Sequence, residues 1–251
     1  MDVAAYLERI GYTGSVEPTA DVLRQLQRAH LFSVPFENLD ISRKREIVVD
    51  PARSVAKVVL QRRGGFCYEL NGAFSWLLRS LGFQVTLLSA RVPRQDGSEG
   101  PEFDHLALRV DVDQPWLADV GFGDSFLNPL KLDTGAEQQD ENGRVFRILQ
   151  EAGEVLEVQR REGDTWKTEY NFSLKARQLE EFAGMCRYHQ TSFESPFTRK
   201  RVCSLATPDG RITLTDGRLI VTRGAERDEQ PVASTAEWDE LLKKYFGVVL
   251  G

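Results

Sequence analysis

The chain has 251 residues, enough for one large domain or for about two to three small ones. Hydrophobic residues make up 41% and charged residues 28%, values typical of a folded globular protein. The net charge of −6 argues against a nucleic-acid-binding protein, which normally carries a basic surplus. A membrane-spanning helix is not expected, since the sequence has no apolar run of about 18 residues.

The N-terminus and the cysteine content favour a cytoplasmic protein. The opening MDVAAYLERIGYTG carries charges where a signal peptide has an apolar segment. Three widely spaced cysteines do not form a disulfide framework, which indicates a reducing compartment. We expect no bound metal, because the sequence has neither a CxxC nor an HxxxH pair.

The first third of the chain predicts helices. Apolar residues recur at helical spacing in VAAYLERIG and in TADVLRQLQRAHLFSV, the latter with Thr19 or Asp21 as N-cap. Asp50 and Pro51 are a cap and a first-turn proline, and they open PARSVAKVVLQR. A further helix of roughly four turns follows, with Cys67 in its first turn and Gly82 after its end. Its apolar face is made by Phe66, Leu70, Ala73, Phe74, Leu77, Leu78 and Leu81.

From Phe83 onward the pattern predicts strands. FQVTLLSARV, HLALRVDV and WLADVGFG come first, with the polar segment 91–104 as a loop between the first two. Three more strands, a helix within 173–190, two hairpins and a capped helix after Ser234 complete the chain. The order predicts an α+β fold in three parts: helical residues 1–82, a β region at 83–188 and a small α/β part at 189–251.

Cys67, in RRGGFCYELNG, has the surroundings of a nucleophile. A first-turn position offers free N–H groups and the positive end of the helix dipole, which predict a low thiol pKa. Gly64 and Gly65 are expected to allow a sharp turn and close approach of a substrate, and the Cys67 N–H could hold an oxyanion. The alternative is an inert buried thiol, which is our interpretation of the other two cysteines.

A thiolate catalyst needs a base, and His105 is the best of three histidines because it opens a strand beside a loop. His30 and His189 are interpreted as packing or surface residues. Asp119 lies on the next strand. The simplest hairpin register pairs residue 112 with 116 and puts His105 and Asp119 on one face, about 13 Å apart along the strand. The sheet would have to twist or bulge, near Gly121 and Gly123, for the two to meet.

These motifs resemble the arylamine N-acetyltransferases, specifically the prokaryotic type, along nearly the whole chain. The matching segments, in family order, are FSVPFENLD, RRGGFCYELNG, DHLALRV, WLADVGFG and SPFTRKRVCSLATPDGRITL. The resemblance implies a helical bundle, a central β-barrel and a C-terminal α/β lid, with a papain- and transglutaminase-like core. It also implies a catalytic triad of Cys67, His105 and Asp119.

The implied reaction is ping-pong acetyl transfer, as in xenobiotic metabolism. Cys67 takes the acetyl group from acetyl-CoA and passes it to an aromatic amine or hydrazine, with no metal. Phe36 and Phe122 would line the slot for the ring, or else belong to the core, and Gly123 would admit pantetheine. Arg63 would shape the cysteine loop together with Gly64 and Gly65. The alternative is an amide synthase, or an acyltransferase that uses another acyl donor on the same triad. We expect no nucleic-acid or membrane partner, and the sequence does not predict the oligomeric state.

Overall fold

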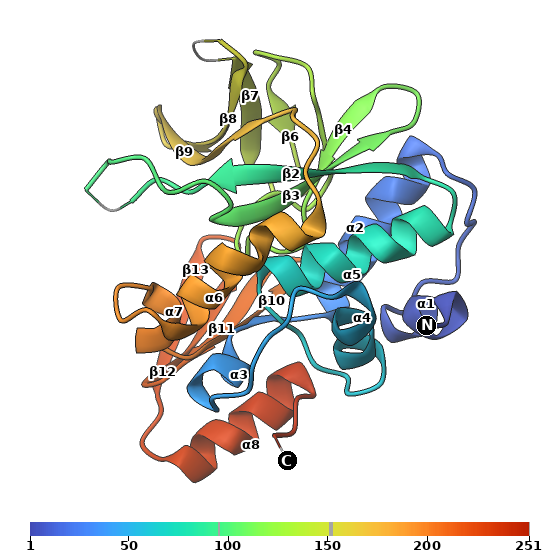
Figure 1. The fold of residues 1–251 in the computed structure, drawn as a ribbon. Coiled ribbons are helices and arrows are strands. Elements are labelled where there is room, and N and C mark those ends of the chain that lie inside the picture. Colours follow the sequence, from blue (N-terminus) through green and yellow to red (C-terminus); the bar gives the residue numbers. More distant parts are fainter. Residues whose placement is uncertain (95, 151–152, 251) are drawn as a thin grey trace.

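The computed structural model describes residues 1–94, 96–150 and 153–250. The N-terminal part of the chain is helical (Figure 1). Thr19 is the N-cap of the second helix and Asp50 that of the fourth, because each side chain accepts a backbone N–H of the first turn. Gly82, at φ +91°, follows the end of the fifth. The helices are α1 (Val3–Arg9), α2 (Ala20–Ser33), α3 (Leu39–Ser42), α4 (Pro51–Val59) and α5 (Cys67–Ser80).

The middle of the chain forms an eight-stranded antiparallel sheet in the order β5-β4-β3-β2-β9-β8-β7-β6. Its two end strands come together through one side chain: Gln138 accepts from the Lys131 N–H at 2.7 Å and donates to the Lys131 carbonyl at 3.0 Å. The sheet is therefore a nearly closed barrel, as predicted. Its strands are β2 (Gln84–Arg91), β3 (His105–Asp111), β4 (Pro115–Ala118), β5 (Leu130–Lys131), β6 (Gln138–Gln139), β7 (Val145–Gln150), β8 (Val155–Glu162) and β9 (Thr165–Ser173).

A second sheet, in the order β1-β10-β11-β12-β13, joins the two ends of the chain. Strand β1 (Phe36–Glu37) comes from the helical part and pairs with β10, so Phe36 lies opposite Ser204. Helix α8 (Thr235–Phe246) packs on this sheet and ends at Gly247 (Figure 1). The other strands are β10 (Val202–Thr207), β11 (Gly210–Thr215), β12 (Arg218–Arg223) and β13 (Glu226–Pro231).

Helix α5 lies between the helical part and the barrel, against β2 and β3 (Figure 1). Its residues Leu70, Ala73, Phe74, Leu77 and Leu78 are fully buried, which explains why its apolar face is so broad. A short connection, η1 (Leu179–Phe182), α6 (Ala183–Thr191) and α7 (Pro196–Arg199), leads from the barrel to the second sheet. None of the helices in the described residues is long and apolar enough to cross a membrane.

Candidate active site

Cys67 is the first residue of α5, and it is buried at 4% exposure. The N-cap, Phe66, has no capping oxygen, so Glu69 reaches back and accepts the Phe66 N–H at 3.2 Å. Glu69 is itself held by Lys57, whose Nζ lies 2.7 Å from its carboxylate. The helix start that carries the thiol is thus fixed by a buried ion pair.

Gly64 and Gly65 serve close packing rather than a turn. A Cβ on Gly64 would lie 1.8 Å from the Pro35 carbonyl oxygen, and one on Gly65 would lie 2.6 Å from Glu69. The two glycines let the segment before Cys67 run beside Phe36, with which Gly65 forms a parallel β-bridge. The expected reason, a sharp turn, is wrong here, since the chain makes neither a turn nor a bend at these two residues.

Arg63 is buried at 3% exposure behind the cysteine loop. Its guanidinium lies 2.7 Å from Glu37 and 3.1 Å from Asp40. It therefore ties the segment before Cys67 to β1 and α3, which is the structural arrangement expected for a residue that shapes this loop.

The β3–β4 pairing differs from the predicted register by two residues. Leu108 lies opposite Ala118 and Asp111 opposite Pro115, so the three-residue connection comprises residues 112–114 instead of the expected 113–115. Continuing this pairing puts residue 107 opposite Asp119, so His105 and Asp119 are offset by two residues, about 7 Å, instead of four. Strand β4 ends at Ala118, and the chain bends there, which closes the remaining gap.

His105 and Asp119 make direct contact, with 2.6 Å between Nε2 and Oδ2. Both side chains are buried, at 3% and 1% exposure. Asp119 also accepts hydrogen bonds from Asn71 Nδ2 (2.8 Å), the Gly121 N–H (2.8 Å) and the Tyr170 hydroxyl (3.1 Å). Burial alone would raise the pKa of Asp119, but the charge of His105 and the hydrogen bonds from His105, Asn71 and Gly121 together lower it below its usual value.

Asn71 connects the cysteine helix to β3 and to the segment after β4 that carries Asp119, contacts that we did not predict. Its amide nitrogen donates to the Leu106 carbonyl at 2.6 Å as well as to Asp119, and its oxygen accepts the Val120 N–H at 2.9 Å. Asn71 lies one helical turn after Cys67 in the CYELN segment, so this spacing was the available signal. On the far side, Gln27 of α2 accepts the Asp119 N–H at 3.0 Å.

A cavity of about 570 Å³ opens onto Cys67 and His105. Phe36 and Phe122 lie in its wall, and the His105 and Phe122 rings pack edge to face at 5.2 Å. Gly123, at φ +98°, lies beside the Phe36 ring. The polar loop between β2 and β3 borders the same cavity through Arg94, Asp96, Pro101 and Asp104.

The expected low pKa of the Cys67 thiol is wrong for these surroundings. Burial raises the pKa well above its usual value, the hydrogen bond with the Leu106 backbone lowers it, and Cys186, Asp104 and Asp119 raise it further. Removing the thiol proton therefore requires a base inside the cavity. His105 lines the same cavity, and its Nε2 is engaged by Asp119, which leaves Nδ1 for that task.

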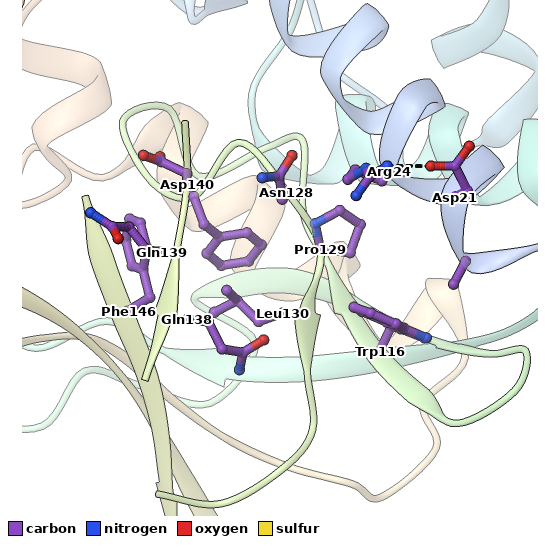
Figure 2. Close-up of a pocket in the computed structure, with 12 residues that line it drawn as sticks. Asp21, Arg24, Trp116, Asn128, Pro129, Leu130, Gln138, Gln139, Asp140 and Phe146 are labelled. Atoms are coloured by element: carbon purple, nitrogen blue, oxygen red, sulfur yellow. Dashed lines mark hydrogen bonds and ion pairs between the residues drawn. The ribbon is translucent and has the colours of Figure 1, made fainter. Parts of the chain in front are cut away.

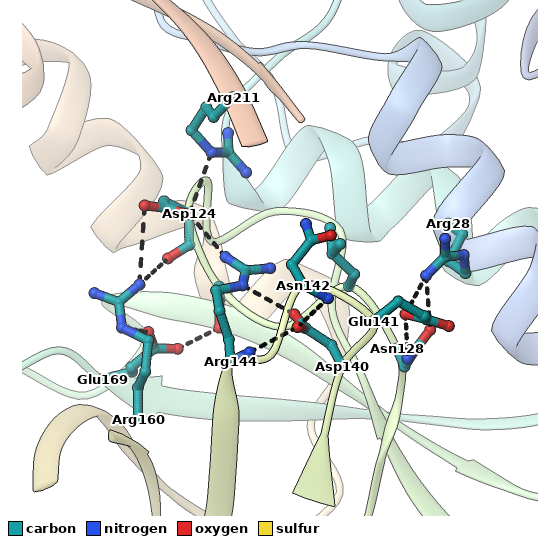
Figure 3. Close-up of polar contacts among 12 residues, drawn as sticks. Arg28, Asp124, Asn128, Asp140, Glu141, Asn142, Arg144, Arg160, Glu169 and Arg211 are labelled. Carbon is teal, nitrogen blue, oxygen red and sulfur yellow. Dashed lines mark hydrogen bonds and ion pairs between the residues drawn. The ribbon is translucent and has the colours of Figure 1, made fainter. Parts of the chain in front are cut away.

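The loop after Phe122 is anchored by arginines (Figure 3). Asp124 lies 3.1 Å from Arg144 and 3.2 Å from Arg211, and Arg160 donates to its carbonyl at 3.4 Å. Arg144 directly precedes β7 and Arg160 lies in β8 of the barrel, whereas Arg211 lies in β11 of the second sheet. These contacts fix the segment that carries Phe122 and Gly123 to the barrel and to the second sheet.

Two further cavities have no comparable chemistry. One of about 240 Å³, between α2 and the barrel, is lined by an Asp21–Arg24 ion pair, amides and apolar side chains (Figure 2). The other, about 600 Å³, borders Cys186, whose pKa is raised to about 12 by burial, and no histidine is among its lining residues. The candidate active site is therefore identified by its thiol, imidazole and carboxylate, and not by the volume of its cavity.

The sequence matches the N-acetyltransferase family over residues 19–251. A chicken (Gallus gallus) arylamine N-acetyltransferase is 33% identical across 100% of this chain and 95% of its own length. The chain belongs to the arylamine N-acetyltransferase family. The solved arylamine N-acetyltransferase of Salmonella typhimurium has a TM-score of 0.93 and 33% identity, covering 98% of this chain and 90% of that one. The Mycobacterium marinum enzyme in complex with CoA has a TM-score of 0.91 and 30% identity, covering 98% and 93%.

Membership in the family confirms the predicted class of activity. The protein is an arylamine N-acetyltransferase, which uses acetyl-CoA as acyl donor. The fold prediction is confirmed as well, since these neighbours share the arrangement of helices and barrel. Within the described residues, no group of three or more His, Cys, Asp or Glu side chains could hold a metal ion.

Proposed function

We propose that this arylamine N-acetyltransferase works by a ping-pong mechanism on Cys67, His105 and Asp119. The observation that supports it is the 2.6 Å His105–Asp119 contact in the wall of the cavity that also holds the Cys67 thiol. Asp119 accepts a hydrogen bond from Nε2–H and stabilises the imidazolium, so Nδ1 is the nitrogen that takes the proton of the thiol. The sulfur attacks the carbonyl carbon of acetyl-CoA, the C–S bond to CoA breaks, and CoA leaves with a proton.

In the second half-reaction, the acetyl group moves from Cys67 to an amine. The nitrogen of an arylamine or arylhydrazine attacks the acetyl-Cys67 thioester, and His105 accepts the proton that the nitrogen loses. The Cys67–acetyl bond breaks, and the thiol is restored. The N–H groups at the start of α5 face developing negative charge on the acetyl oxygen, with the backbone N–H of Cys67 as the first donor.

Phe36 and Phe122 are proposed to hold the ring of the acceptor. Both line the cavity, and the face of a flat aromatic ring matches the apolar wall that they form. Gly123 is proposed to leave room for pantetheine at the edge of this wall. Arg63, Gly64 and Gly65 are proposed to act through the shape of the cysteine loop, consistent with the ion pairs and close backbone contacts behind it.

The division into residues 1–82, 83–188 and 189–251 stays a prediction, and so does the cytoplasmic location. The three cysteines are free and buried, which suits a reducing compartment. We expect small-molecule partners only, an acyl-CoA and an aromatic amine or hydrazine, without nucleic acid or membrane.

The test is intact-mass spectrometry after incubation with acetyl-CoA, without an amine and then with aniline. We expect one acetyl group on wild type, its loss when aniline is added, and no adduct on Cys67→Ser. Cys186→Ser is the matched control, because that thiol faces a cavity without a histidine, and it should be acetylated as wild type is. Malonyl-CoA and propionyl-CoA in parallel test the alternative acyl donors. An unmodified wild-type protein with every acyl-CoA would contradict the proposal.

A further inference from the structure

A second imidazole–carboxylate pair lies in the wall of the same cavity. His189 of α6 and Asp104, the residue before β3, both line it, and His189 Nε2 is 3.1 Å from Asp104 Oδ1. The side chains are 5% and 15% exposed. The proposed mechanism has no use for this pair, although it is buried beside the reacting thiol.

The ring of His189 is held in one orientation. It packs edge to face on Phe197 at 5.1 Å and on Tyr188 at 5.5 Å, and it is tilted against Tyr68 at 6.2 Å. Its Nδ1 lies 3.2 Å from the hydroxyl of Ser195. A side chain fixed in this way presents its remaining nitrogen in a defined direction.

The hydrogen bonds of Ser195 favour one tautomer of the ring. Its hydroxyl oxygen already accepts the Phe197 N–H at 3.3 Å, so the hydroxyl proton is available for His189 Nδ1. The ring proton then resides on Nε2. Nε2 is buried and has no aligned hydrogen-bond partner among the described residues, despite its short distance to Asp104. A buried donor and an adjacent carboxylate therefore border the cavity without satisfying each other.

We propose that His189 and Asp104 recognise a hydroxyl group on the aromatic ring of the acyl acceptor. A hydroxyl satisfies both groups at once, because its oxygen accepts from Nε2–H and its proton is donated to the Asp104 carboxylate. A ring carboxylate would be repelled by Asp104, and an ammonium has no lone pair for Nε2–H. The apolar ring would still lie against Phe36 and Phe122. The inference rests on the proposed function and adds a preference among acceptors.

The experiment compares 4-aminophenol with 4-methoxyaniline as acceptors for the acetylated enzyme. Both carry an electron-donating oxygen, so their amines react alike, but the methoxy group cannot donate to Asp104. We expect wild type to favour 4-aminophenol about 10- to 100-fold in kcat/KM. His189→Leu should reduce the ratio to within about threefold of one, and His189→Gln, whose amide can replace Nε2–H, should restore part of it.

The matched control is His30→Leu. His30 is also a buried histidine with both nitrogens unpartnered in the described structure, but it packs on Tyr6 and Phe74 and does not line the cavity. His30→Leu should keep the wild-type ratio of kcat/KM between the two acceptors.

Asp104→Asn is a second variant, and it leaves the size of the side chain unchanged. It should raise kcat/KM for 4-aminobenzoate at least about tenfold, because it removes the repulsion between Asp104 and the carboxylate of this acceptor.

The outcomes separate the two proposals. Equal kcat/KM for the two acceptors in wild type, or an unchanged ratio in His189→Leu, would overturn the recognition role and leave the acetyl transfer intact. If His189→Leu loses kcat/KM equally with both acceptors, His189 has a purely structural role, and this result also overturns the inference. If wild type acetylates neither acceptor although acetyl-CoA is present, the proposed function itself fails.

Discussion

Replacement of Asp119 by asparagine should disable the proposed base without disturbing the fold. Two donors, Asn71 Nδ2 and the Gly121 N–H, point at Oδ1 from 2.8 Å each, so the oxygen of the new amide must occupy that position. Its NH2 group then faces His105 Nε2, where the carboxylate lay at 2.6 Å. Nε2 has to accept this hydrogen bond, and the ring proton moves to Nδ1, the nitrogen that should take the proton of Cys67.

The size of the effect has two parts. The imidazolium loses a charge-assisted hydrogen bond, worth about 1.5–3 kcal/mol, and the ring must also leave the favoured tautomer before it can act as a base. An orienting carboxylate in a comparable triad contributes about 10⁴-fold. We therefore expect the rate of Cys67 acetylation to fall about 10³- to 10⁴-fold, equivalent to roughly 4–5.5 kcal/mol.

The assay is single-turnover release of CoA from acetyl-CoA, followed with a thiol reagent and by intact mass. Tyr170→Phe is the matched control: it removes the 3.1 Å hydroxyl contact to Asp119 but keeps the charge, and we expect less than about a tenfold loss. Thermal unfolding of both variants checks the fold. An Asp119→Asn rate within tenfold of wild type would refute the role of Asp119 as the group that orients His105.

Two further predictions concern stability. Gly64→Ala should lower the free energy of unfolding by about 3 kcal/mol or more, since its Cβ would lie 1.8 Å from the Pro35 oxygen. Gly72→Ala within α5, where a Cβ would have nothing within 4 Å, should raise the free energy of unfolding by about 0.5–1 kcal/mol. Urea unfolding measures both, and equal effects of the two substitutions would contradict the close-packing explanation. Burial, only partly offset by Lys57, raises the pKa of Glu69 to about 7, above its unfolded value of 4.5, so the stabilisation from its proton is complete below about pH 4.5 and is lost as the pH rises through 7. Wild type should thus lose up to about 3 kcal/mol relative to Glu69→Gln between pH 5 and 8, and parallel stability curves of the two proteins would exclude this titration.

Local sequence determined the element that carries the nucleophile. The glycines before Cys67, the apolar face after it and Gly82 at its end are all near in sequence, and short-range rules place a helix over them. The same holds for the caps at Thr19 and Asp50. The family motifs then identified the activity, because several long segments in the right order specify a family without reference to their contacts.

The partners of the thiol were less accessible to sequence reasoning. Residue alternation put His105 and Asp119 on one face, but it could not fix which three residues form the turn, and a shift of the turn by one residue changed the register by two. Asn71 was missed as the connection between the three segments, because its contacts are 35 and 48 residues away in the chain.

Tertiary structure alone decided the electrostatics of the site. A first-turn position predicts a low thiol pKa from the helix dipole, an effect of about 1 kcal/mol, whereas burial against the barrel outweighs it and raises the pKa. Tertiary structure also placed His189 in the wall of the cavity, whereas the sequence suggested a packing or surface residue. Helix and strand patterns follow from neighbours in the chain, while desolvation depends on which distant segments cover a side chain, and the order of residues does not show that directly.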